Sequence, residues 1–84
     1  MENISLYVCA YNDEKEIEEV IIGILNLDPK PNEIIIVNDG STDDTLKILN
    51  KYKNNITIFN LAKNMGLPHA RNVAIKNSKN DIVA

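Results

Sequence analysis

Apolar and polar positions alternate along this chain in blocks that predict strands and helices in turn. Mostly apolar runs at residues 4–10 and 33–37 are typical of strands buried on both faces, as parallel strands usually are. The run at residues 56–61 alternates more loosely, which predicts a third strand nearer to a sheet edge. Residues 81–84 look like the start of a fourth strand.

Helix signals separate these runs. From Ile17 to Leu25, apolar residues recur at spacings of three and four, which is the clearest amphipathic pattern in the chain. Asp13, with Glu16 three residues later, resembles a capping box at the start of this helix. After the second strand, Ser41 or Thr42 is expected to cap a second helix.

The order of the elements predicts the fold class. Pro68 suits the first position of a third helix, and small residues follow it on the side expected to pack. Strand, helix and strand recur at a spacing of roughly thirty residues, which implies parallel pairing through right-handed crossovers. We therefore expect an α/β, Rossmann-like fold of three layers, with a parallel sheet of three to four strands and about three helices on both faces.

Composition limits the classes to which this chain can belong. Its 84 residues make one domain, and 44% hydrophobic with 25% charged residues is ordinary for a globular protein. A net charge of −3 gives no broad basic field for nucleic acid, and no apolar run approaches the ~18 residues of a transmembrane segment. Cys9 is the single cysteine and no charged leader precedes a long apolar segment, so a cytoplasmic location fits best.

Unusual polar residues follow the ends of the predicted strands. Ligands of open α/β sheets bind outside the carboxyl ends of the strands, so these ends are the expected site. Asp39, directly after a buried apolar run, is the first candidate, and the same edge should collect residues 11–14, residues 62–66 and Arg71. The alternative for Asp39 is a local role in capping the second helix.

Several familiar sites do not match the sequence. It contains neither the G-x-G-x-x-G pattern of dinucleotide-binding folds nor the G-x-x-x-x-G-K-[ST] pattern of phosphate-loop NTPases. His69 and Cys9 each stand alone, and Asp39, Asp43 and Asp44 fit a loop and a helix cap better than a zinc site. No trio of residues suggests a nucleophilic triad.

Three motifs together resemble family 2 glycosyltransferases. They are VCAYNDE at residues 8–14, EIIIVNDGSTDDT at 33–45 and NMGLPHARN at 64–72, in the family's order and spacing. The resemblance covers essentially the whole chain and implies the amino-terminal, nucleotide-binding half of a GT-A catalytic domain. The implied activity is transfer of a sugar from a nucleotide-diphosphate donor, expected to be a UDP-sugar, to an unknown acceptor.

The resemblance assigns six residues to the donor nucleotide: Ala10, Tyr11, Glu14, Asp39, Gly66 and Arg71. Tyr11 is expected to pack against the base, with Ala10 offering backbone groups, and Asp39 to accept the imide proton of uracil. Glu14 matches a carboxylate that accepts a hydrogen bond from the ribose hydroxyls. Arg71 matches an arginine near the base and diphosphate, and the glycine permits the close turn that presents it.

The resemblance also indicates which parts of a complete enzyme are expected outside residues 1–84. The family's Asp-x-Asp motif, which holds Mg or Mn against the donor diphosphate, should follow within a few residues of Val83, and the general base lies farther downstream. We therefore expect a domain truncated before that motif. Residues 1–84 are expected to hold no catalytic residue and no metal ligand, and the isolated chain to be inactive.

Alternatives stay open at this point. The chain is the donor-binding part of a glycosyltransferase or a noncatalytic nucleotide-binding or interaction module; a flavodoxin-like module shares only the architecture. Each of three residues has an alternative role without a ligand. Tyr11 is then a plain aromatic residue of the core or its rim, Glu14 a charge in the first turn of a helix, and Arg71 a partner in a surface ion pair. An unpaired last strand predicts self-association through a sheet edge. In a longer protein, the inner membrane face is a further expected location.

Overall fold

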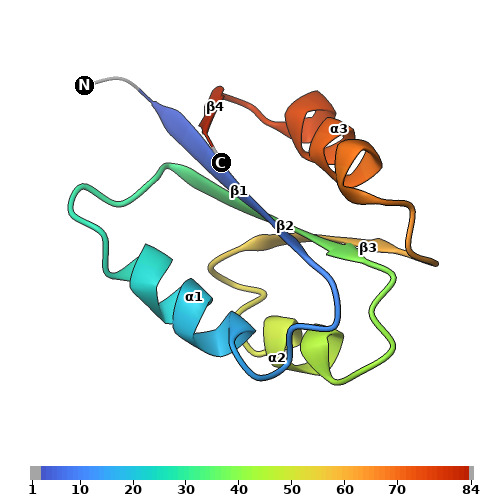
Figure 1. Cartoon of the computed structure of the whole chain (residues 1–84). Coiled ribbons are helices and arrows are strands. Elements are labelled where there is room, and N and C mark those ends of the chain that lie inside the picture. The colour runs from blue at the N-terminus through green and yellow to red at the C-terminus, as the bar shows by residue number, and fades with distance from the viewer. Residues whose placement is uncertain (1–2, 84) are drawn as a thin grey trace.

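The computed structural model describes residues 3–83 and contains four strands and three helices (Figure 1). In chain order the elements are β1 (Ile4–Ala10), α1 (Ile17–Leu25), β2 (Glu33–Asp39), α2 (Thr45–Asn50), β3 (Thr57–Leu61), α3 (Leu67–Asn77) and β4 (Asp81–Val83). The strands are all parallel and lie in the order β3-β2-β1-β4. The predicted α/β class, parallel sheet and three helices are confirmed.

The helices cover both faces of the sheet because the strand order reverses once. From β1 to β3 the chain moves across the sheet in one direction, and right-handed crossovers place α1 and α2 on the same face. The chain then returns past β1 to β4, so α3 lies on the opposite face (Figure 1). The result is the expected three-layer arrangement.

The sheet separates two apolar cores. The fully buried apolar residues of the helices are Ile17, Ile21 and Leu49 on the α1 and α2 face, and Ala70 and Ala74 on the α3 face. The side chains of β2 alternate between these cores, with Ile34 and Ile36 in the first and Ile35 and Val37 in the second. This alternation follows from the two-residue period of a strand, and it makes β2 the central strand of the packing.

β1 is less buried than its apolar sequence predicts. Residues 34–39 of β2 are all buried, whereas residues 6–9 of β1 are only half-buried. On the α3 face, the helix packs mainly on β2 with small side chains, which leaves Tyr7 and Cys9 partly open. The prediction of a strand buried on both faces is therefore correct for β2 and wrong for β1.

Both helices on the first face begin later than their sequence signals suggest. α1 starts at Ile17, and its N-cap residue Glu16 makes no side-chain capping bond; α2 starts at Thr45, also without one. The predicted capping box and the predicted cap at Ser41 or Thr42 are therefore wrong. At α1, the Ile17 amide donates to the Asp13 carbonyl rather than to a side chain. At α2, Ser41 and Thr42 bind Asn12 of the loop after β1, and the Thr45 amide donates to Asp43 Oδ1 instead.

Candidate functional site

The carboxyl ends of β1 and β2 open onto a cavity of about 410 Å³. β1 lies where the strand order reverses, with β2 on one side and β4 on the other, and ligands of open α/β sheets bind at such reversals. The cavity is lined by Cys9, Ala10, Tyr11, Asp39, Asn64, Gly66 and Leu67. Four of the six predicted site residues therefore meet here.

Asp39, the last residue of β2, is 4% exposed, and the loop before α3 binds its carboxylate. Its Oδ1 accepts a hydrogen bond from the Met65 amide at 2.8 Å, and its Oδ2 accepts from the Gly66 amide and Asn64 Nδ2, both at 3.1 Å. The alternative role as a cap of the second helix is wrong, because all these donors precede α3. Since a carboxylate has about four acceptor positions, one remains on Oδ1 for a further donor.

Two glycines let the loops around Asp39 approach closely. Gly40 has a φ of 69°, and a Cβ there would lie 2.2 Å from the backbone nitrogen of Asn64. Gly66, with a φ of 92°, is the N-cap residue of α3. Both angles lie in the left-handed region, which glycine adopts without strain. The chain therefore turns sharply at both places, and the loop after β2 touches the loop after β3.

Tyr11 forms the aromatic wall of the cavity. It is the first residue after β1 and is 51% exposed, so its ring is open to a ligand rather than buried in the core. Ala10, just before it, is 1% exposed. Burial, and then the negative charge of Asp39, raise the pKa of the Cys9 thiol, so Cys9 lines the cavity as a neutral thiol at neutral pH.

Glu14 and Arg71 line neighbouring cavities. Arg71 lines one of about 330 Å³ that shares Leu67 with the Tyr11 cavity, so the two cavities adjoin. Within residues 3–83, Arg71 forms no salt bridge. Glu14 lies with Asp43 on a separate cavity of about 360 Å³. The structure therefore does not bring all six predicted residues into one pocket.

Sequence reasoning missed a set of bonds between the loop after β1 and the loop after β2. The Asn12 amide donates to Ser41 Oγ at 2.9 Å, and Asn12 Oδ1 accepts from the Thr42 amide at 2.8 Å. These partners are 29 and 30 residues apart along the chain. The only available signal was the density of polar residues at two strand ends, because no local pattern reports such a distant pair.

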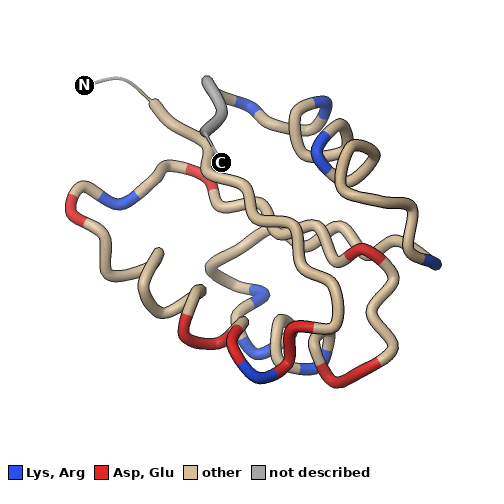
Figure 2. The backbone as a smooth tube through the Cα atoms, viewed as in Figure 1, with Lys and Arg blue, Asp and Glu red and all other residues tan. Residues whose placement is uncertain are grey.

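Charge is distributed unevenly along the chain. Residues 45–80 contain no Asp or Glu, and their basic residues are Lys47, Lys51, Lys53, Lys63, Arg71, Lys76 and Lys79. Figure 2 shows acidic residues gathered around the start of α1 and the loop before α2, and only basic charges on α3. An anionic group is therefore attracted toward α3, on the side of the cavity where Arg71 lies.

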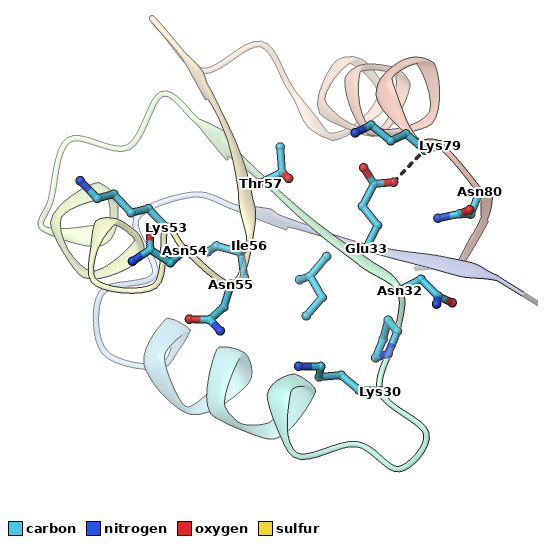
Figure 3. Close-up of a pocket in the computed structure, with 12 residues that line it drawn as sticks. Lys30, Asn32, Glu33, Lys53, Asn54, Asn55, Ile56, Thr57, Lys79 and Asn80 are labelled. Carbon is cyan, nitrogen blue, oxygen red and sulfur yellow. Dashed lines mark hydrogen bonds between the residues drawn. The ribbon is translucent and has the colours of Figure 1, made fainter.

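A larger cavity, of about 530 Å³, lies at the opposite edge of the sheet, beside the amino ends of β2 and β3 (Figure 3). Its carboxylate, Glu33, accepts hydrogen bonds at Oε1 from the Lys79 amide at 2.9 Å and from Ser5 Oγ at 2.7 Å. These two bonds, that of Lys79 first, hold the pKa of Glu33 below its usual value. The cavity contains none of the predicted site residues, and its carboxylate fastens the segment after α3 to the sheet.

Neither a metal-binding cluster nor a membrane-spanning helix is present among residues 3–83. These residues contain no group of three or more His, Cys, Asp or Glu side chains placed to hold a metal ion. The same residues include no helix with the length and apolar character needed to cross a bilayer.

Comparison with known proteins defines the class of this one. The model of Glycosyl transferase family 2 matches residues 5–84, so the chain belongs to this family. Poly-beta-1,6-N-acetyl-D-glucosamine synthase of Staphylococcus aureus (strain COL) is 39% identical over 99% of this chain and 21% of that protein. The protein of the same name from Staphylococcus epidermidis is 33% identical over the same shares. The chain thus spans about a fifth of the length of these relatives.

Solved structures agree with this family. The crystal structure of S. aureus TarS 1–349 in complex with UDP-GlcNAc matches with a TM-score of 0.85 and 36% identity, over 96% of this chain and 25% of that chain. The structure of TarS 1–349 matches with a TM-score of 0.83 and 37% identity. The expected GT-A type of α/β architecture is confirmed by these matches.

Proposed function

We propose that this chain forms the donor-nucleotide pocket of a glycosyltransferase and that the donor is a UDP-sugar. The observation that carries the proposal is the cavity lined by Ala10, Tyr11, Asp39 and Gly66 at the carboxyl ends of β1 and β2. Membership of glycosyl transferase family 2 and the likeness to TarS, which was crystallised with UDP-GlcNAc, support it.

Asp39 and Tyr11 give this pocket a preference for uracil. Uracil presents an N–H donor at N3, whereas cytosine presents an acceptor there, and the remaining acceptor position on Asp39 Oδ1 suits the donor. The exposed ring of Tyr11 offers a planar face on which a base can stack. The bonds from the loop before α3 fix the Asp39 carboxylate in advance, so binding need not order it.

Arg71 and Glu14 act at the borders of the pocket. The Arg71 guanidinium, in the adjoining cavity and within the basic segment 45–80, suits charge-assisted hydrogen bonds to the donor diphosphate. Glu14 is proposed to accept from the ribose hydroxyls, reaching the nucleotide from the cavity on the other side of the loop after β1.

We propose that residues 1–84 are a donor-binding portion whose role is to bind and orient the nucleotide. Sugar transfer then requires groups outside this portion, including a divalent metal, Mg or Mn, and a general base that deprotonates the acceptor. The chain alone is expected to be inactive as a transferase. Transfer assays on the isolated chain with UDP-GlcNAc and simple sugar acceptors test this expectation.

We also propose that copies of this chain associate through the sheet. Among residues 3–83, β3 and β4 are the outer strands of the sheet, and each has one strand neighbour. Unpaired strand edges are templates for pairing with another chain. A molecular mass that rises with concentration in light scattering supports this association, and a strict monomer at high concentration contradicts it.

Titration by NMR tests the nucleotide proposal directly. The isotopically labelled chain is titrated with UDP, and separately with CDP, ADP and GDP as controls that keep the diphosphate. Saturable amide shifts near Tyr11, Asp39 and Gly66, strongest with UDP, are expected. If millimolar UDP produces no localised shifts, the proposal fails and a noncatalytic interaction module replaces it.

A further inference from the structure

We propose that Asn12 is a positioning residue of the nucleotide pocket. Its side chain fixes the loop after β1, which carries Tyr11, against the loop that follows Asp39. Asn12 does not line the Tyr11 cavity; it lines the neighbouring one beside Glu14. The inference rests on the proposed function, because the placement of Tyr11 affects binding only if a base stacks on its ring.

The backbone of Asn12 has the conformation that this role requires. Its φ is 48°, in the left-handed region, where asparagine is enriched among residues other than glycine. In this conformation its amide reaches Ser41 Oγ at 2.9 Å while its Oδ1 accepts from the Thr42 amide at 2.8 Å. A longer contact of 3.4 Å joins the same Oδ1 to the Asp43 amide. One residue therefore binds the opposite loop with both its main chain and its side chain.

Ser41 continues this connection into the sheet. Its Oγ donates to Asn38 Oδ1 at 2.5 Å, and Asn38 Nδ2 donates to Asn60 Oδ1 at 2.8 Å. Asn38 is 1% exposed, so losing either bond would leave a buried amide group without a partner. Asn12 is thereby connected to the buried end of β2 and, through it, to β3.

Two further bonds hold the next part of the loop. The Asp13 amide donates to Thr45 Oγ1 at 2.8 Å, and the Glu14 amide donates to Asp43 Oδ2 at 3.2 Å. Burial raises the pKa of Asp43, but its bonds from the Thr45 side chain and the Thr45 and Glu14 amides outweigh this effect and lower it overall. Asp43 therefore stays an ionised acceptor at neutral pH. Asn12 is the contact nearest to the aromatic residue.

The test replaces Asn12 with glycine, which keeps the positive φ and removes the acceptor oxygen. Asn12→Asp keeps an acceptor oxygen at the same position and serves as the conservative rescue. The matched control is Asn32→Ala at the opposite edge of the sheet. Asn32 Oδ1 accepts from the Ile4 amide at 2.9 Å, so the control loses the same kind of bond far from the pocket.

Two quantities are measured on the full chain: UDP affinity by NMR titration and backbone order by the ¹⁵N heteronuclear NOE. Asn12→Gly is expected to weaken UDP binding about tenfold and to lower the NOE of residues 11–14. Its unfolding midpoint should shift no more than that of Asn32→Ala, which keeps native affinity, and Asn12→Asp should bind within about threefold of the native chain. Native affinity in Asn12→Gly, an equal loss in Asn32→Ala, or no rescue by Asn12→Asp overturns the proposal.

The design separates this inference from the proposed function. If the native chain binds no UDP, the proposed function and the positioning role in binding both fail, and backbone order then tests only the structural part of the inference, that Asn12 fixes the loop after β1. A lowered NOE at residues 11–14 in Asn12→Gly but not in Asn32→Ala then supports it. An unchanged NOE in Asn12→Gly overturns it.

Discussion

Each end of β2 carries a carboxylate that binds backbone amides next to α3, but the two carboxylates have different surroundings. Glu33, its first residue, binds the Lys79 amide after α3, and Asp39, its last residue, binds the Met65 and Gly66 amides before α3. Two carboxylates on one strand thus fasten both ends of α3 to the sheet. The first adjoins an open cavity with a lysine and asparagine rim, and the second adjoins the cavity of Tyr11.

The two carboxylates differ in how they use their oxygens. Both bonds to Glu33 end on Oε1, so its second oxygen is dispensable to the fold. The bonds to Asp39 occupy both oxygens, and the residue is buried. Asp39 therefore has two properties that suit a ligand-binding carboxylate: bonds on both oxygens hold it in place, and it lines the same cavity as the aromatic ring of Tyr11. Glu33 has neither property.

The largest expected effect comes from a methyl group at Gly40, beside Asp39. Gly40→Ala places a Cβ 2.2 Å from the backbone of Asn64 at a φ of 69°, and backbone cannot move aside as a flexible side chain can. We expect the free energy of unfolding to fall by about 3 kcal/mol or more, measured by urea denaturation.

A matched glycine makes this test sharper. Gly23 lies in α1 with no heavy atom within 4 Å of an added Cβ, so Gly23→Ala should raise stability by ~0.5 to 1 kcal/mol. Similar small effects at Gly23 and Gly40 would contradict the close contact between the loops after β2 and β3.

Removing one carboxylate oxygen from each end of β2 tests the comparison itself. Asp39→Asn replaces one acceptor oxygen with an NH2 donor that faces donors already in place, so it should cost about 1 to 3 kcal/mol of stability and weaken UDP binding about tenfold. Glu33→Gln can keep both its bonds on Oε1, so stability should change by less than about 1 kcal/mol, with UDP affinity unchanged. Equal losses from both substitutions would show that the two ends are equivalent.

Substitution of Tyr11 should change the UDP affinity of the Asp39 end while leaving the free energy of unfolding almost unchanged. The residue is 51% exposed, so Tyr11→Ala should change the free energy of unfolding by no more than about 0.5 kcal/mol. Loss of stacking should weaken UDP binding by about 1 kcal/mol, near fivefold, whereas Tyr11→Phe keeps the ring and should bind almost as the native chain does. Isothermal titration calorimetry measures these affinities. A destabilised Tyr11→Ala protein would indicate a packing role instead.

The smallest effect is a pH dependence located at the Glu33 end. The folded chain lowers the pKa of Glu33 from 4.5, through the Lys79 amide and the Ser5 hydroxyl. Because the folded pKa is depressed, the stabilisation is present above pH 4.5 and is lost as the pH falls through the folded pKa. Thermal unfolding between neutral and acidic pH should therefore show a smaller decline for Glu33→Gln than for the native chain. An identical decline would remove Glu33 as its source.

The strands were predictable because their signals are local. The apolar run at residues 4–10 predicted both ends of β1 correctly, and Pro68 predicted the start of α3 to within one residue. The starts of α1 and α2 were not predictable in the same way, because polar residues near them bind partners about thirty residues away. Ser, Thr, Asp and Asn residues cap a helix in one fold and form hydrogen bonds between two loops in another.

The site was predictable in type and only partly in composition. Strand ends placed Tyr11 and Asp39 at one edge, and the cavity they share follows from the parallel sheet. The sequence did not show that the loop before α3 would bind Asp39, or that Asn64 and Leu67 would complete the wall. Those features depend on how the loop after β3 folds back, which is a tertiary property.

The pairing of β4 with β1 has a consequence for the order of folding. Ile4 pairs with Asp81, nearly the full length of the chain away, whereas β1 with β2 and β2 with β3 close much shorter loops. Because loop closure costs more entropy as the loop lengthens, the three strands β1, β2 and β3 should associate before β4 joins them. The first part to fold would then contain the loop that carries Asn12 and the loop after β2 to which it bonds. The edge formed by the carboxyl ends of the strands would therefore be in place before β4 completes the sheet.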